Sequence, residues 1–182
     1  GCFYRGETIE RMAATEFQRN ICRLIASNRI AQGESYVAGG VALNELINSS
    51  RISRDIDLFH DSPEAGLRAW EMDRDAPPSA DYSVDVVRLL PSFVESLVKK
   101  GEEVVIIQWA TDSAFRFFPL VEDKTFGLTL HPFDLATNKV LALAGRLEVR
   151  DWIDVINCHR QIQNAGYLFW AACGKDPGFN PV

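Results

Sequence analysis

The spacing of hydrophobic residues changes along the chain from a helical period to a strand-like period and back again. Between Glu7 and Ser27, apolar residues recur every three or four positions, which predicts one long amphipathic helix. Farther along, short segments in which apolar and polar residues alternate predict strands. The predicted strands are Ser35–Ala38, Arg54–Phe59, Ser83–Leu89, Val104–Thr111 and Ala114–Val121, with a further short one at Leu128–His131.

Helical spacing also occurs between and after these strands. Pro91 at a first turn and Gly101 as a stop predict a helix over Pro91–Lys100. The other predicted helices are a short one within Val41–Asn48 and longer ones at Pro63–Met72, Phe133–Gly145, Arg150–Gln163 and Tyr167–Cys173. This order predicts an α+β fold, a mixed sheet of about five strands flanked by helices. We expect a core with its N-terminal helix at 1–131 and a C-terminal helical part at 132–182, together forming one compact unit.

Composition limits the classes of function. The 182 residues carry a formal net charge of −6, which argues against broad electrostatic attraction to nucleic acid but leaves room for a local basic groove. The four cysteines are scattered and form no Cys-x-x-Cys motif, so neither a zinc cluster nor a disulfide framework is expected. The sequence shows no membrane-spanning apolar run and no signal peptide, so we expect a cytoplasmic protein without a membrane partner.

Two short motifs suggest chemistry on phosphates. Gly39-Gly40 follows a predicted strand, and paired glycines let the backbone approach phosphate oxygens closely. Asp55 and Asp57 lie two residues apart on a predicted strand, so both carboxylates point to the same face. Mg²⁺ prefers such oxygen ligands. The order of glycines, helix and acidic strand therefore predicts a phosphate cradle beside a Mg²⁺ site.

This arrangement resembles the polymerase-β-like nucleotidyltransferase superfamily. A second segment, from Asp134 through Lys139 to Arg146 and on to Asp151 and Val155, is similar to the downstream motif of the AbiEii/AbiGii-type nucleotidyltransferases. Many members of that family are toxins of type IV toxin–antitoxin pairs. The resemblance implies a nucleoside triphosphate substrate, bound Mg²⁺ and an antitoxin partner.

The resemblance also implies a third carboxylate on a neighbouring strand, as general base for the incoming hydroxyl. Asp112, after the strand Val104–Thr111, is the first choice, and Asp85 is the second. Gln108 is a further possibility for the position where relatives carry an acid, in which case the base is missing. Surface aspartates with no role remain an equal alternative for both acids.

Lys139 and Arg146 are seven residues apart, which places them on one face of a helix within reach of the same triphosphate. The resemblance implies that Lys139 contacts the nucleotide and that Asp151 is its partner on the next helix. Asp151 and Asp154 share a face there, and Asp151 is predicted to hold Lys139 or Arg146. An ordinary interhelical salt bridge is the alternative.

Two residues beside the motifs are assigned to the nucleotide site. Ser53 precedes the acids and either donates to a phosphate or ends a loop. Val41 follows the two glycines, where relatives commonly have Ser or Thr, so one hydrogen bond to the terminal phosphates is lost.

The sequence therefore predicts Mg²⁺-dependent transfer of a nucleoside monophosphate from a triphosphate to an acceptor hydroxyl. The acceptor is RNA, a protein side chain or a small molecule, and an antitoxin is a partner in the toxin interpretation. A nucleotide-binding module with weak or no turnover is one alternative. A small-molecule, antibiotic-type nucleotidyltransferase is another, and an interaction protein with an incidental Asp-x-Asp is a third.

Overall fold

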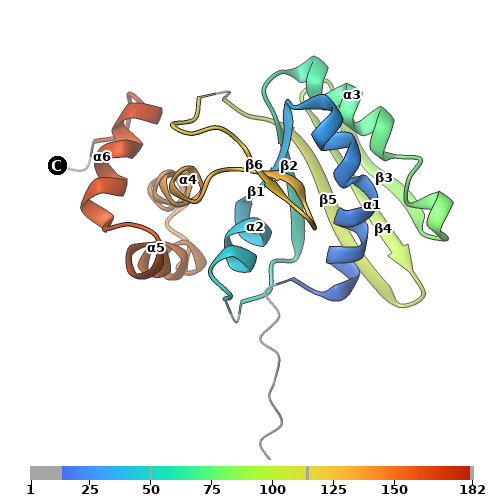
Figure 1. Ribbon diagram of the computed structural model, residues 1–182, viewed down its shortest axis with the longest axis horizontal. Helices are drawn as coiled ribbons and strands as arrows, with labels where there is room; N and C mark the ends of the chain where they lie inside the picture. The colour runs from blue at the N-terminus through green and yellow to red at the C-terminus, as the bar shows by residue number, and fades with distance from the viewer. Residues whose placement is uncertain (1–13, 50, 114, 181–182) are drawn as a thin grey trace, which may run out of the picture.

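A seven-stranded mixed sheet forms the centre of the molecule in the residues that the computed structural model describes, which are 14–49, 51–113 and 115–180 (Figure 1). The strand order is β3-β4-β5-β2-β1-β7-β6. The strands are β1 (Ser35–Ala38), β2 (Asp55–His60), β3 (Ser83–Leu90), β4 (Phe93–Lys100), β5 (Glu103–Thr111), β6 (Val121–Asp123) and β7 (Gly127–Thr129). The mixed α+β class is confirmed, and the strand count exceeds the expected five.

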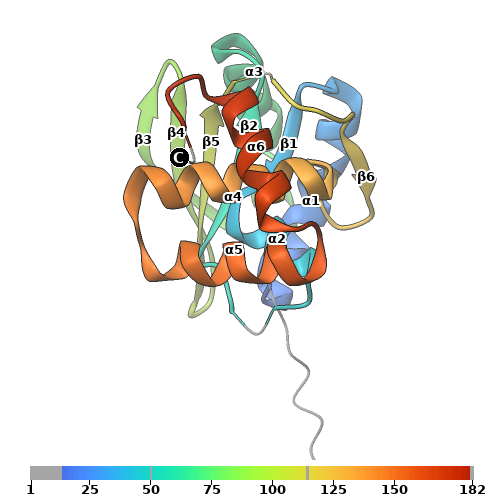
Figure 2. The ribbon, with the colours of Figure 1, turned by 90° about the vertical axis from the view of Figure 1, so that its left-hand side faces the viewer.

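Helices cover the sheet unequally. They are α1 (Glu16–Gln32), α2 (Gly39–Leu46), α3 (Pro63–Asp73), α4 (Pro132–Arg146), α5 (Val149–Gln161) and α6 (Ala165–Lys175), and a 3₁₀ turn spans Pro78–Ala80. The helices α1 and α3 lie together at the sheet, whereas α4, α5 and α6 gather on the opposite side of the molecule, next to α2 (Figures 1 and 2). A cavity is lined by residues of the sheet and of the C-terminal helices α4, α5 and α6.

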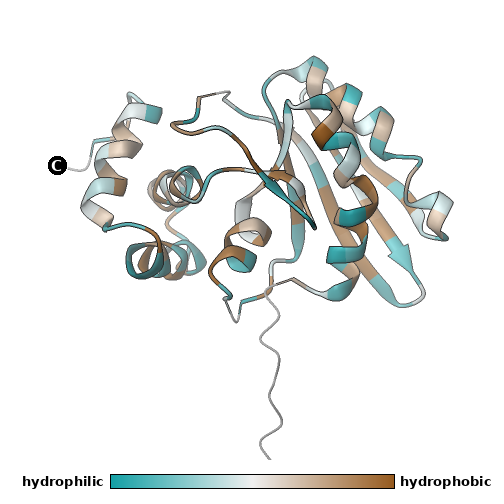
Figure 3. Ribbon diagram, in the orientation of Figure 1, coloured by the Kyte–Doolittle hydropathy of each residue, from teal (hydrophilic) through white to brown (hydrophobic). Residues whose placement is uncertain are grey.

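Two hydrophobic clusters match this division. One joins the sheet with α1 and α3 through residues such as Ile25, Leu58 and Trp109. The other joins α2 with the C-terminal helices through residues such as Leu43, Val140 and Leu168. The hydrophobic colouring concentrates in the strands and on the inner sides of the helices (Figure 3). None of the described helices combines the length and hydrophobicity that a membrane span requires.

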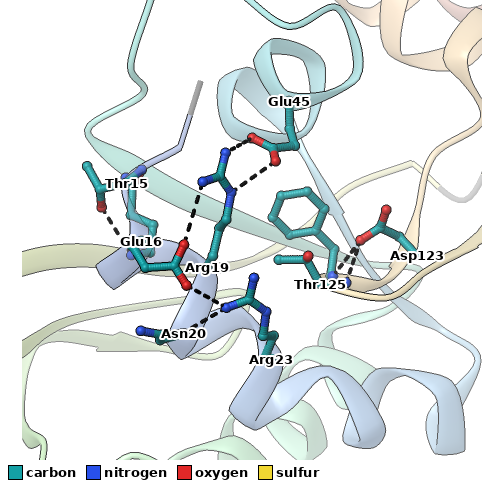
Figure 4. Close-up of polar contacts among 10 residues, drawn as sticks. Thr15, Glu16, Arg19, Asn20, Arg23, Glu45, Asp123 and Thr125 are labelled. Atoms are coloured by element: carbon teal, nitrogen blue, oxygen red, sulfur yellow. Dashed lines mark hydrogen bonds and ion pairs between the residues drawn. The ribbon is translucent and has the colours of Figure 1, made fainter. Parts of the chain in front are cut away.

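The start of α1 differs from the expected helix at Glu7–Ser27. Thr15 and Gln18 form a capping box, each side chain accepting a backbone N–H of the other, and this fixes the helix start at Glu16. Gly33 ends the helix in a left-handed conformation. In the first turns, Arg19 donates two 3.0 Å hydrogen bonds to Glu45 of α2 (Figure 4). Residues 7–13 lie outside the described residues.

The helix expected at Pro91–Lys100 is wrong, because this segment forms strand β4. Pro91 and Ser92 make the turn between β3 and β4, and a second turn at Gly101 leads into β5. Pro91 was misread because proline suits both a helix start and a turn. From Phe93 to Lys99, inward and outward side chains alternate, with Val94, Ser96 and Val98 buried.

The strand expected at Ala114–Val121 is also wrong over its described part. Residues 115–120 form a loop, and β6 begins only at Val121; Ala114 lies outside the described residues. The backbone N–H groups of Phe117 and Phe118 donate to the buried Asp134 carboxylate instead of to a neighbouring strand. Arg116 binds Asp61 through two 2.8 Å hydrogen bonds, which fastens the loop to the end of β2. The domain boundary at residue 131 stays a prediction.

Candidate active site

Asp55 and Asp57 line a cavity of about 490 Å³ between the sheet and the C-terminal helices. Strand β2 places them there because its side chains alternate: Ile56, Leu58 and His60 are buried on the other face of the sheet. β2 lies between β1, to which it is antiparallel, and β5, to which it is parallel. The two acids expected to share a face therefore do so, and that face opens into a cavity.

The two glycines are fitted against these acids. Gly39 begins α2 with φ of +66°, and a Cβ atom built on it would overlap the carboxylate of Asp57. The N–H of Gly40 donates to the Asp57 side chain, and a Cβ on Gly40 would lie 2.7 Å from the hydroxyl of Ser53. Glycine is therefore required at both positions by space, and at Gly39 also by backbone conformation.

Replacement of Gly39 by alanine is expected to be strongly destabilising, because the added methyl group must displace Asp57 as well as adopt a strained φ. Gly33→Ala is the matched control, since Gly33 has a similar φ of +71° and no atom within 4 Å of the added Cβ. Chemical denaturation of both variants isolates the overlap with Asp57. We expect Gly39→Ala to lower the free energy of unfolding by at least about 1 kcal/mol more than Gly33→Ala. Equal losses would contradict this account.

Ser53 and Val41 have different surroundings. Ser53 is buried at the edge of the cavity, and its hydroxyl donates to Asp55 at 3.1 Å, so it orients an acid. Val41 is fully buried in the core, and its side chain does not line the cavity. The assignment of Val41 to the nucleotide site is therefore wrong for its side chain, because the first turn of α2 directs it into the core.

The negative charge of the Asp57 carboxylate is electrostatically unfavourable in the folded protein. Burial, together with the neighbouring charge of Asp55, raises the pKa of Asp57 from 3.8 to about 6. Among the described residues, neither acid forms an ion pair, because the basic side chains of the cavity bind other carboxylates. A divalent cation would remove this repulsion, and the oxygen donors fit Mg²⁺. No described cluster of three or more metal-binding side chains is present, so phosphate and water oxygens would complete the shell.

Basic side chains outnumber acidic ones around the cavity, although the chain as a whole is acidic. Five basic residues line it, and only three acidic ones, Asp55, Asp57 and Asp112, do so. The basic residues are Arg51, Lys139, Arg146, Arg150 and Lys175. They come from the segment before β2 and from the C-terminal helices. An anionic ligand suits this lining.

Buried carboxylates form ion pairs with several of these basic residues. Asp154 of α5, 1% exposed, receives Lys139 at 2.9 Å and two hydrogen bonds from Arg51. Asp151 receives two hydrogen bonds from Arg146, which lower the pKa of Asp151. The pairing of Lys139 with Asp151 that the resemblance implied is wrong, because Lys139 binds Asp154, whereas the alternative pairing of Asp151 with Arg146 is confirmed. One helical turn separates the two acids: Asp151 meets Arg146, and Asp154 meets Lys139 and Arg51.

Helix α5 has an unusual distribution of polarity. Its buried face carries Asp151 and Asp154 beside Val155 and Cys158, and apolar residues are also exposed on its solvent face. These exposed residues are Val149, Trp152, Ile153 and Ile156. The inward face is therefore selected by ion pairing with the cavity cations and not by hydrophobicity alone.

The structure separates the candidates for the third carboxylate. Asp112 lines the cavity at the end of β5 and is exposed. Asp85 lies on the outer strand β3, where it binds Lys99 at 2.7 Å, and it is not in the cavity lining. Gln108 lies directly opposite Asp57 in the β2–β5 register and lines the cavity. An amide thus occupies the strand position beside Asp57.

Sequence reasoning missed several residues of the site. Arg51 and Lys175 belong to no recognised motif, and Phe115 lies in the segment misread as a strand. Glu95 accepts a 2.7 Å hydrogen bond from the Gln108 amide, but the false helix at Pro91–Lys100 hid its place on the sheet. Burial alternates along this strand, but its sequence, Phe-Val-Glu-Ser-Leu-Val-Lys, does not alternate in polarity, so periodicity gave no signal for it.

Comparison with known proteins gives a likeness of fold. No protein-family model matches the chain, and no curated protein matches it. Two solved structures resemble it. MenT4, a nucleotidyltransferase toxin from Mycobacterium tuberculosis H37Rv, has a TM-score of 0.57 at 15% identity over 87% of this chain. The match spans 65% of MenT4, slightly less than two thirds of its length.

The second structure is the antibiotic-resistance factor ANT(2'')-Ia, an antibiotic nucleotidyltransferase. Its TM-score is also 0.57, at 11% identity, and the match covers 87% of this chain and 92% of that one. Identities this low carry no information on substrate. The chain therefore has the fold of nucleotidyltransferases.

Proposed function

We propose that this protein is a Mg²⁺-dependent nucleotidyltransferase that moves a nucleoside monophosphate from a triphosphate to an acceptor hydroxyl. The main support is the Asp55–Asp57 pair, which lies against the glycine turn in a cavity lined by five basic residues. The nucleotidyltransferase fold of MenT4 and ANT(2'')-Ia supports the same reaction class. We also propose that the protein is related to the AbiEii/AbiGii-type nucleotidyltransferases, as its sequence motifs suggest.

In the proposed reaction, the residues of the chain have separate tasks. Asp55 and Asp57 would hold Mg²⁺, which supplies charge stabilisation to the phosphoryl oxygens when bound. Gly39 and Gly40 line the cavity at the start of α2, where their backbone would face the phosphates. Lys139 and Arg146, fixed by Asp154 and Asp151, neutralise charge as pyrophosphate leaves.

The fixed cations have a catalytic advantage. Lys139 is 7% exposed and already bound to Asp154, so it needs little reorganisation when a triphosphate enters. Electrostatic groups that are in place before the reaction stabilise the transition state most effectively. Arg146 is nearly half exposed and reaches farther toward solvent.

Label transfer tests this function. The protein is incubated with Mg²⁺ and each α-labelled nucleoside triphosphate, in separate reactions with total RNA, lysate protein and a mixture of amino sugars. We expect labelling of one acceptor fraction and a fall of at least about 100-fold in the Asp55→Ala/Asp57→Ala variant. Asp85→Ala is the control, because Asp85 is a carboxylate on the same sheet outside the cavity. Equal labelling by the double variant would end the proposal, and transfer of γ-label would indicate a kinase instead.

The choice of acceptors in this experiment follows from the two similar structures. MenT4 is a toxin, and a toxin role here adds an antitoxin partner to the proposal. ANT(2'')-Ia is an antibiotic-resistance factor, which motivates the amino-sugar arm. A nucleotide-binding module without turnover is the second candidate function, favoured by the amide of Gln108 beside Asp57. Mg²⁺-dependent triphosphate binding without label transfer to any fraction would select it.

A further inference from the structure

We propose that Glu95 is the carboxylate that binds the acceptor hydroxyl and takes its proton, and that the acceptor site lies over strands β5 and β4. This inference rests on the proposed nucleotidyl transfer and names its missing base. The observation that supports it is one row of residues across the sheet. In register, Ala38 of β1, Asp57 of β2, Gln108 of β5 and Glu95 of β4 lie side by side.

The side chains of this row share the cavity face. Asp57 and Gln108 both line the cavity. Glu95 is not itself among the lining residues, but it lies next to them on the same face of the sheet, where it accepts the 2.7 Å hydrogen bond from the Gln108 side chain. Glu95 is partly exposed, so a molecule in solution can reach it. The neighbours of Glu95 on β4, Val94 and Ser96, are buried on the opposite face.

The glycine turn gives the row a direction. Gly39 and Gly40 follow Ala38 on the β1 side of Asp57 and line the cavity there. In the proposed reaction their backbone faces the phosphates, so pyrophosphate leaves on that side. In-line displacement puts the attacking oxygen opposite the leaving oxygen. The acceptor therefore approaches from the other side of Asp57, over β5 and β4, where Gln108 and Glu95 lie.

The spacing fits one attacking group. Neighbouring strands are about 4.8 Å apart, so β4 is about 10 Å from β2. A phosphoryl group near Asp57, an attacking oxygen about 3 to 3.5 Å from phosphorus and a hydrogen bond of about 3 Å to a carboxylate fill such a gap. An acid at position 108 would lie beside Asp55 and Asp57, the proposed metal ligands. Glu95, one strand farther, suits proton removal from the acceptor.

In the proposed transfer step, the acceptor oxygen forms a bond to the α-phosphorus, and the bond from that phosphorus to the bridging oxygen of pyrophosphate breaks. The hydroxyl proton passes to the Glu95 carboxylate, and the electron pair of the broken bond leaves on pyrophosphate. Gln108 is a positioning residue, because its amide donates to Glu95 and holds that carboxylate toward the cavity.

The test compares Glu95→Gln, Glu95→Asp, Asp112→Asn and Asp85→Asn with wild type. Asp112 is the rival acid of the cavity, and Asp85 is a carboxylate of the adjacent strand outside it. Transfer of α-label is measured to the fraction that wild type labels among total RNA, lysate protein and amino sugars. Mg²⁺-dependent binding of a fluorescent triphosphate and Tm are measured in parallel.

We expect Glu95→Gln to lower kcat by about 100-fold or more. Triphosphate binding and Tm should stay close to wild type, and Glu95→Asp should retain part of the rate. The control Asp85→Asn should keep most of the rate, and Asp112→Asn, the rival acid, should lose much less of it than Glu95→Gln. Full activity of Glu95→Gln, or a comparable loss in Asp112→Asn alone, would overturn the assignment. Loss of triphosphate binding in Glu95→Gln would also overturn it, because Glu95 would then act on the nucleotide. Absence of transfer by wild type would instead end the proposed function itself.

Discussion

Asp57→Asn is expected to abolish nucleotidyl transfer and, at the same time, to make the folded protein more stable. The carboxylate of Asp57 is buried beside Asp55, which raises its pKa to about 6. A shift of about 2 units corresponds to about 3 kcal/mol of unfavourable free energy when the group is charged. Asparagine removes the charge while keeping an oxygen for the Gly40 N–H. We expect a gain of about 1 to 3 kcal/mol in the free energy of unfolding at neutral pH.

The pH dependence of this gain has a definite sign. The pKa of Asp57 is higher in the folded state than the ordinary 3.8, so the folded state binds more protons between pH 3.8 and about 6. Stability therefore falls as pH rises through that window. Denaturation of wild type and Asp57→Asn should give equal results below the window and the full difference above it. A variant less stable than wild type at neutral pH would contradict this account.

Activity and metal response should move in the opposite direction. We expect label transfer by Asp57→Asn to fall at least about 100-fold. MgCl₂ should raise the Tm of wild type, because a ligand that binds only the folded state stabilises it, and should raise that of the variant less. Asp112→Asn, which changes an exposed acid of the same cavity, is the control for general electrostatic effects. Undiminished transfer in Asp57→Asn would exclude its proposed role in metal binding.

Removal of Asp154 should have the largest effect on stability among the acids behind the cavity. Asp154 is 1% exposed and binds both Lys139 and Arg51, so Asp154→Asn leaves two cations without their shared partner. Loss of one partner from a buried ion pair costs about 3 to 5 kcal/mol. Triphosphate binding should weaken about tenfold or more, because Lys139 loses the charged hydrogen bond that fixes it.

Asp151→Asn is the matched control for this prediction. Asp151 lies on the same face of α5 and is equally buried, but its partner Arg146 is 45% exposed and can turn to water. We therefore expect a loss of only about 1 kcal/mol. Urea denaturation and fluorescent-triphosphate titration of both variants make the comparison. Equal losses in the two variants would show that sharing of Asp154 by two cations is unimportant.

The parts of the site that sequence predicts are those that depend on local spacing. The two-residue period of a strand is enough to put Asp55 and Asp57 on one face, and the glycines precede a helix that the same pattern indicates. The pairing of Arg51 with Asp154 joins residues 103 positions apart, and no local rule reports such a contact. The choice between Asp151 and Asp154 as partner of Lys139 depends on the rotation of α5, which tertiary packing sets.

The errors in secondary structure have physical causes. Pro91 suits the first turn of a helix as well as a tight turn, and the two-residue connection to β3 decides between them. The segment around Phe117 has the alternating pattern of a strand, but its N–H groups bind Asp134, which lies far along the chain. The first error matters more for the site, because a helix over Pro91–Lys100 would take Glu95 away from the sheet.

The exposed apolar residues of α5 have a consequence for redesign. Hydropathy alone would assign Trp152 and Ile156 to the core, but Val155 and Cys158 lie there together with the two acids. The exposed apolar residues are therefore the positions open to change. Trp152 and Ile156 can be exchanged for hydrophilic residues to improve solubility, while the ionic scaffold beneath the helix stays untouched.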